Sequence, residues 1–355
     1  MNDLHYAVVV GINRYPGIRD LTYARTDAEA FRDWLVSADG GQLPEENVVL
    51  LAATPLEEQG FASAAGARPK RSEVDIALRQ VNQKVRDHVA QSPNDWDRTR
   101  LYLYASGHGI APPTSQGAML MADAERDVLG ECIELARYSE WYEGCGVFRE
   151  LVVLADTCRE RAPGAPPGTL PPFNLCARPY GRITKVVGYA TSVAEFAFEP
   201  VGADDPDDQR GYFTKALLEG LGGAAAVDPE LGGITSETVA VYVRKAVEEL
   251  TKDQQHAQIL VEAGSPILLR PTEVNPPKRP RWKVSIVLPA GFQGEVELRR
   301  GDHSVVERRA AAQTPWEVEL EEGLYGVSSV NGASAPTLAN SGLFEVLAGD
   351  TNVRL

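Results

Sequence analysis

The sequence has no apolar run that approaches the roughly 18 residues needed to cross a bilayer. Its N-terminus carries no basic segment followed by an apolar stretch, so we expect no signal peptide. Only four cysteines are present, and no two of them form a Cys-x-x-Cys pair. A chain of 355 residues does not need disulfides to be stable, so we expect free thiols in a reducing, cytoplasmic environment.

Positive charge is scarce, with 35 Lys and Arg against 50 Asp and Glu and a formal net charge of −15. A protein that coats nucleic acid or binds anionic membranes is expected to be basic, so neither function is favoured. A basic segment of a protein substrate would instead be attracted. The hydrophobic content of 43% is enough for a substantial core, and the length fits one large domain with a smaller one.

Strand and helix patterns alternate along most of the chain. Short apolar runs predict strands at 5–13, 48–51, 101–105, 151–155, 186–190 and 267–269. Apolar residues spaced three and four apart predict helices at about 26–36, 74–89, 131–142, 212–221 and 235–250. This alternation predicts an α/β domain over residues 1–270, with a mostly parallel six-stranded sheet flanked by helices.

The pattern changes after residue 270. Residues 271–281 hold four prolines in eleven positions, which is typical of a semi-rigid linker. From 282 to 355, apolar and polar residues alternate between turn signals. We therefore predict a small C-terminal antiparallel β-sandwich domain over 282–355.

Two residues of catalytic type follow two of the predicted strands. His108 comes just after the strand at 101–105, and Cys158 comes just after the strand at 151–155. Open α/β sheets bind ligands beyond the carboxyl ends of their strands, so these side chains are expected to meet there. A histidine can take the proton of a thiol nucleophile, and the Gly109 and Cys158 amides could hold an oxyanion.

Several motifs in this order make the chain resemble the caspase-like cysteine peptidases, the clan of caspases, metacaspases and their bacterial relatives. The motifs cover about residues 5–270, and they are Gly11-Ile12-Asn13-Arg14-Tyr15, Thr26-Asp27-Ala28, Tyr104-Ala105-Ser106-Gly107-His108-Gly109, Asp156-Thr157-Cys158-Arg159, Ala190-Thr191-Ser192 and Gly211-Tyr212-Phe213-Thr214. The spacing of about 50 residues from histidine to cysteine is also that of caspases.

The resemblance implies a cysteine endopeptidase with His108 as the base and Cys158 as the nucleophile. It also implies that Asp27 and Asp156, which match acidic pocket residues of metacaspases, hold an Arg or Lys side chain before the scissile bond. Metacaspases usually carry His-Ser-Gly after the cysteine, where this chain has Arg159-Glu160-Arg161. The subfamily therefore stays open.

Regulation and cofactors are further expectations from the resemblance. The 159–182 loop contains Arg159, Arg161, Arg178 and Arg182, so the enzyme itself or an upstream protease could activate the chain by cutting there. Bacterial relatives often act in defence, stress or cell-death pathways. We expect no cofactor, because the acidic run at 204–208 lacks the spacing of a calcium loop and makes a Ca²⁺ site the weaker alternative.

Less specific interpretations stay open at this stage. A cysteine at a strand end is more often a small core residue, Asp27 could be an acidic charge at a helix N-terminus, and Asp156 could orient backbone. At the level of the whole chain, the alternatives are a catalytically silent caspase-like scaffold and an acyl-transfer enzyme that does not act on long peptides.

Overall fold

In the computed structural model, the described residues are 2–52, 64–112, 117–126, 132–161, 171–173, 183–200, 209–262, 266–272, 281–289, 294–300, 305–312, 314–329, 342–347, 349 and 351–354. The chain divides into two compact units, Met1–Pro276 and Pro277–Leu355. The division falls inside the segment 271–281 that the sequence predicts to be a linker.

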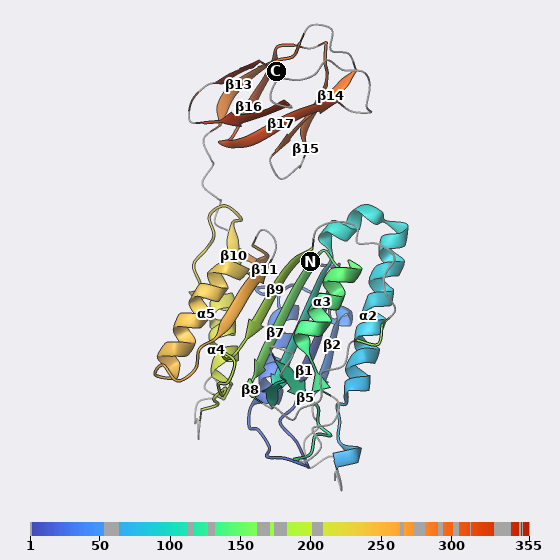
Figure 1. The fold of residues 1–355 in the computed structure, drawn as a ribbon, viewed down its shortest axis with the longest axis vertical. Helices are drawn as coiled ribbons and strands as arrows, with labels where there is room; N and C mark the ends of the chain where they lie inside the picture. The colour runs from blue at the N-terminus through green and yellow to red at the C-terminus, as the bar shows by residue number, and fades with distance from the viewer. Residues whose placement is uncertain are drawn as a thin grey trace. The chain divides into compact units, whose positions relative to one another are not determined.

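The first unit is built on a six-stranded sheet with the strand order β11-β9-β7-β3-β1-β2 (Figure 1). Its strands are β1 (His5–Gly11), β2 (Val48–Ala52), β3 (Arg100–Gly107), β7 (Glu150–Thr157), β9 (Thr184–Tyr189) and β11 (Gln258–Glu262). All neighbours pair in parallel except β11, which runs antiparallel to β9. Residues of β3 and β9 are buried throughout, as expected for strands covered on both faces.

Helices cover both faces of this sheet. The helices are α1 (Ala24–Val36), α2 (Arg71–Gln91), α3 (Leu135–Cys145), α4 (Tyr212–Glu219) and α5 (Ser236–Leu250). Buried residues of α1, α4 and α5 form one apolar layer with the sheet, and those of α2 and α3 form the other. The predicted α/β class, with a mostly parallel six-stranded sheet flanked by helices, is confirmed.

The structure corrects two element assignments. The sixth strand of the main sheet is β11, whereas the predicted strand at 267–269 overlaps β12 (Leu268–Pro271), which pairs with β10 (Gly233–Thr235) in a separate two-stranded sheet. The helix predicted at 131–142 starts later, because Cys132–Ile133 forms a short strand, β6, before α3. Local apolar patterns of this length do not show which strands will pair, because pairing is decided by tertiary contacts.

A small four-stranded sheet, in the order β6-β5-β4-β8, continues from the carboxyl ends of β3 and β7. It consists of β4 (Gly109–Ala111), β5 (Ala118–Leu120), β6 and β8 (Glu160–Arg161). Because β4 follows β3 after one residue and β8 follows β7 after two, this sheet fixes the chain around His108 and Cys158.

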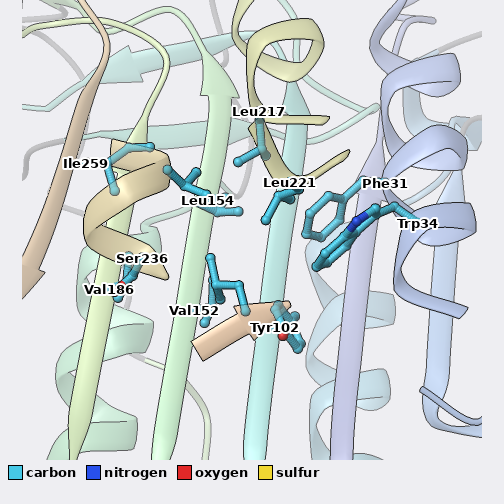
Figure 2. A pocket seen from close by; sticks show the side chains of 12 residues that line it. Phe31, Trp34, Tyr102, Val152, Leu154, Val186, Leu217, Leu221, Ser236 and Ile259 are labelled. Atoms are coloured by element: carbon cyan, nitrogen blue, oxygen red, sulfur yellow. The ribbon is translucent and has the colours of Figure 1, made fainter. Parts of the chain in front are cut away.

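The α1, α4 and α5 layer encloses a small apolar cavity of about 10 Å³ (Figure 2). Side chains from the sheet and the helices line it, among them Phe31, Tyr102, Leu154, Leu217 and Ile259. This volume admits about one water molecule, and the lining offers few polar partners. The cavity is therefore a packing gap in the core.

The regular elements described in the second unit are all strands. Its three-stranded sheet is β16 (Trp316–Leu320), β13 (Trp282–Val287) and β19 (Thr351–Arg354), and its four-stranded sheet is β15 (Val305–Ala310), β14 (Glu295–Arg300), β17 (Gly323–Ser329) and β18 (Leu343–Val346). The pairs are antiparallel except β13 with β19. Apolar residues of both sheets form one core around the buried Trp316.

Candidate active site

The sheet register brings His108 and Cys158 to the same edge of the first unit. Strands β3 and β7 pair in parallel up to Gly107 opposite Thr157, and pairing resumes with Ile110 opposite Glu160. His108 and Cys158 lie between these paired positions, so they occupy neighbouring places at the carboxyl edge. The sequence prediction that their side chains meet at this edge stays a prediction.

The His108 imidazole is held in a defined orientation and tautomer. Its Nε2 atom lies 2.6 Å from the carbonyl oxygen of Arg19, and a carbonyl oxygen only accepts hydrogen bonds, so Nε2 is the donor. In the neutral ring, Nδ1 therefore carries the lone pair. Burial lowers the pKa of His108 below its usual value, against an opposing effect of the Arg19 contact. A neutral imidazole with a free lone pair can act as a general base.

The Cys158 thiol is only partly exposed and is contacted by the segment that follows β9. The Ala197 amide donates to Sγ at 3.3 Å, and Sγ lies 3.7 Å from the Ala197 carbonyl oxygen. Burial raises the pKa of Cys158, and the charge of Asp156 raises it further. The geometry therefore fits a neutral thiol that loses its proton during reaction, rather than a preformed thiolate.

Asp27 and Asp156 converge below this edge on Gly211. Asp27 comes from the first turn of α1, Asp156 from the end of β7, and the two residues are 1% and 7% exposed. A Cβ atom placed on Gly211 would lie 2.6 Å from Asp156 Oδ2 and 3.1 Å from Asp27 Oδ2. The two carboxyl groups therefore share one site, and their role in binding a basic side chain stays a prediction.

Each carboxyl group is held by hydrogen bonds. Asp27 accepts from the Gly211 amide at 3.0 Å and from the Ser106 hydroxyl at 3.1 Å. Asp156 accepts from the amide and the hydroxyl of Thr214, at 3.1 and 2.6 Å. Both groups are thus fixed by side chains or amides of neighbouring elements.

The shared burial changes the acidity of this pair. Burial raises the pKa of Asp27 well above its usual range, and the nearby Asp156 raises it further. Burial also raises the pKa of Asp156, to about 6, although both contacts with Thr214 act in the opposite direction. A cationic guest would stabilise the ionised carboxylates and reverse these shifts.

A third acidic residue, Glu199, was missed by the sequence analysis. Its carboxylate accepts from the amides of Thr22 and Tyr23 at 3.0 and 3.1 Å, just before α1. Its charge raises the pKa values of Asp27, Asp156, His108 and Cys158, which places it near all four. Glu199 lies well beyond the end of β9. Looking for polar residues directly after predicted strands, which pointed to His108, therefore could not find it.

Gly109 contacts the backbone at Cys158 directly. A Cβ atom here would collide with the Cys158 carbonyl oxygen and lie 2.6 Å from Thr157 Cβ. The glycine is therefore required by the packing of the two strands. The oxyanion role of the Gly109 and Cys158 amides stays a prediction.

Within the described ranges, no group of three or more His, Cys, Asp or Glu residues is arranged to hold a metal ion. The acidic run at 204–208 lies outside those ranges. None of the helices in the described parts of the chain is long and apolar enough to span a bilayer.

No family model matches the chain. A curated relative from a Desulfuromonadales bacterium, described as "Probable protease", is 30% identical over 226 residues, which are 62% of this chain and 26% of that protein. The chain thus spans about a quarter of the length of this curated relative.

Two solved structures are similar in fold. Caspase-1 from Spodoptera frugiperda matches with 13% identity and a TM-score of 0.43, over 76% of this chain and 93% of that chain. A protein from Geobacter sulfurreducens matches with 15% identity and a TM-score of 0.40, over 78% of this chain and 97% of that chain.

The residue after Cys158 is not an accessible cleavage site. The Arg159 side chain is fully buried, its Nη1 donates to the Thr191 carbonyl at 2.8 Å, and its guanidinium lies 4.2 Å from the centre of the Tyr189 ring. Arg159 is therefore excluded as a cleavage site, which leaves Arg161, Arg178 and Arg182 of the four arginines considered. Arg161 is exposed on β8, and Arg178 and Arg182 lie outside the described residues.

Proposed function

We propose that this chain is a cysteine endopeptidase that cleaves protein substrates after Arg or Lys. The observation that carries the proposal is that His108 and Cys158 occupy neighbouring places beyond the paired ends of β3 and β7, with the buried carboxyl group of Asp156 two residues before Cys158. The relative described as a probable protease supports a peptidase at the general level. No other chemistry accounts as well for a thiol, a neutral imidazole and two buried carboxyl groups at one edge.

The proposed reaction uses each residue in turn. His108 Nδ1 takes the proton of Cys158 as Sγ attacks the carbonyl carbon, and the Gly109 and Cys158 amides hold the oxyanion. The imidazolium then donates that proton to the leaving amine, which breaks the peptide bond and leaves a thioester on Cys158. Water, deprotonated by His108, hydrolyses the thioester and restores the thiol.

The proposed substrate pocket selects basic side chains. Asp27 and Asp156 would receive the Arg or Lys before the scissile bond, with Glu199 as a third acidic group nearby. A guanidinium can contact two carboxylates in a bidentate manner, so Arg should be preferred over Lys.

The chain is further proposed to be a regulated protease of a bacterial defence, stress or cell-death pathway. Cleavage in the 159–182 loop, by the enzyme itself or by an upstream protease, would release restraint on the site. An Arg178→Ala/Arg182→Ala variant that stays uncut and yet has full activity would exclude this activation step.

The first experiment measures hydrolysis of fluorogenic peptides with Arg, Lys or Asp before the scissile bond, with and without calcium, and with Cys158→Ala as the blank. We expect turnover after Arg and Lys that the blank lacks. Turnover after Asp would contradict the acidic pocket. A protein that stays inert after mild proteolysis of the 159–182 loop would instead be a silent scaffold.

A further inference from the structure

Two residues of the loop after β1, Arg19 and Tyr15, contact His108. Tyr15 has no part in the proposed chemistry. Arg19 supplies the carbonyl that binds Nε2. Tyr15, four residues earlier, accepts from the His108 backbone amide at 3.0 Å through its hydroxyl oxygen. Its ring also packs against the imidazole, with the ring centres 4.8 Å apart.

The Tyr15 hydroxyl is inserted into a β-ladder. Strands β4 and β5 pair antiparallel, with Gly109 opposite Met119, so the next pair along this ladder is His108 with Leu120. The Leu120 amide donates directly to the His108 carbonyl at 2.8 Å. The return bond is replaced by a relay, because the His108 amide donates to Tyr15 and the Tyr15 hydroxyl donates to the Leu120 carbonyl at 3.2 Å.

The surroundings leave this hydroxyl no other position. Tyr15 is 1% exposed, and a Cβ atom on Gly107 would lie 2.6 Å from its oxygen. The loop that presents it is fixed by Asp20, which accepts from the Tyr15 amide at 2.8 Å and from the Arg14 side chain. The phenol is therefore a rigid spacer between two strands.

We propose that Tyr15 is a positioning residue for His108, a role that rests on the proposed peptidase function. Its hydroxyl holds the His108 backbone away from Leu120 and thereby sets where the imidazole lies relative to Cys158. Without the hydroxyl, the His108 amide and the Leu120 carbonyl can bond directly, since this closes a regular antiparallel pair. The fold would survive that change, but the imidazole would shift.

The test compares Tyr15→Phe with Tyr142→Phe. Tyr142 is an equally buried tyrosine whose hydroxyl donates to Asn82 Oδ1 at 2.9 Å, in the layer of α2 and α3. With an Arg peptide, we expect Tyr15→Phe to lower kcat at least tenfold with less than a twofold change in KM, because small misplacements of a reacting group are costly. Tyr142→Phe should keep the wild-type kcat. Equal kcat values for the two variants would overturn the proposal.

A second measurement does not depend on turnover. In a Cys158→Ala background, the ¹⁵N chemical shifts of His108, assigned by their loss in His108→Gln, report its tautomer and pKa. Arg19 and Glu199, whose charges act on the ring, are unchanged in all variants. We expect a single Nε2–H tautomer that Tyr15→Phe alters and Tyr142→Phe does not. If Tyr15→Phe changes the ¹⁵N shifts of His108 in a protein that shows no peptidase activity, the proposed function fails and the positioning role stands. If Tyr15→Phe leaves these shifts unchanged, the positioning role is refuted.

Discussion

Asp27 and Asp156 show how two carboxyl groups become poor acids when they share a buried site. Because their pKa values are raised, the folded protein keeps protons here that the unfolded chain releases above about pH 4. This pair therefore stabilises the fold less as the pH rises through about 6, which is the pKa of Asp156. A cation in the pocket would remove that penalty.

Binding of a basic substrate should consequently depend on pH. With the Cys158→Ala variant and an uncleaved Arg peptide, titration calorimetry should show a Kd about tenfold lower at pH 7.5 than at pH 5, because Asp156 with a pKa of about 6 ionises between them. Asp156→Asn should weaken binding at pH 7.5, although its amide oxygen can still accept from Thr214.

The matched control is Asp75→Asn, which alters another buried carboxyl group, on α2. It should leave the pH dependence of Kd intact, since Asp75 contacts Tyr138 rather than the pocket. A Kd that does not change between pH 5 and pH 7.5 would argue against the acidic pair as the binding site.

At the residue scale, strand ends in the sequence point to His108 and Cys158, whereas Asp27 and Asp156 are candidates only through the resemblance to metacaspases; the roles of all four stay predictions. Glu199 and the Tyr15 relay could not be predicted in the same way. Their roles depend on a turn and on the spacing of two strands, which no local pattern of residue types encodes.

The elements of the first unit follow the apolar patterns closely in the centre of the sheet and less closely at its margins. Strands β1, β3, β7 and β9 are buried on both faces and therefore read as continuous apolar runs. The edge strand β11 contains Gln258 and Glu262 among its five residues, so its pattern is weaker. The two-residue strands β6 and β8 leave almost no sequence signal.

The layer formed by α1, α4 and α5 should be sensitive to loss of volume. Leu217 of α4 is 1% exposed and lines the small cavity. Leu217→Ala enlarges that cavity and should lower the free energy of unfolding by about 2–5 kcal/mol. Urea unfolding followed by circular dichroism would measure this; a change below about 1 kcal/mol would mean that the layer collapses to fill the space.

The whole molecule contains separate cores. The buried apolar clusters of the first unit contain no residue of the second, and the cluster around Trp316 contains only residues from 284 onward, among the residues described. The switch from helical to alternating patterns near residue 281 made this division visible in the sequence. Each unit therefore has its own source of stability.

Substitutions in one core should not affect the other. Trp316→Ala, at a side chain that is 1% exposed, should destabilise the second unit by about 3–5 kcal/mol. Calorimetry of the full chain should show one heat-absorption peak moving to lower temperature while a second stays in place, with Leu217→Ala giving the reverse. A single peak that moves in both variants would mean that the two units unfold as one.

The relay through Tyr15 also carries an evolutionary consequence. The hydroxyl fits only because position 107 has no side chain, since a Cβ atom would lie 2.6 Å from the Tyr15 oxygen and 2.7 Å from Met119 Cε. Positions 15 and 107 should therefore covary among homologues. Lineages that acquire alanine at 107 should also have lost the tyrosine at 15, and their histidine would have to be oriented by a different device.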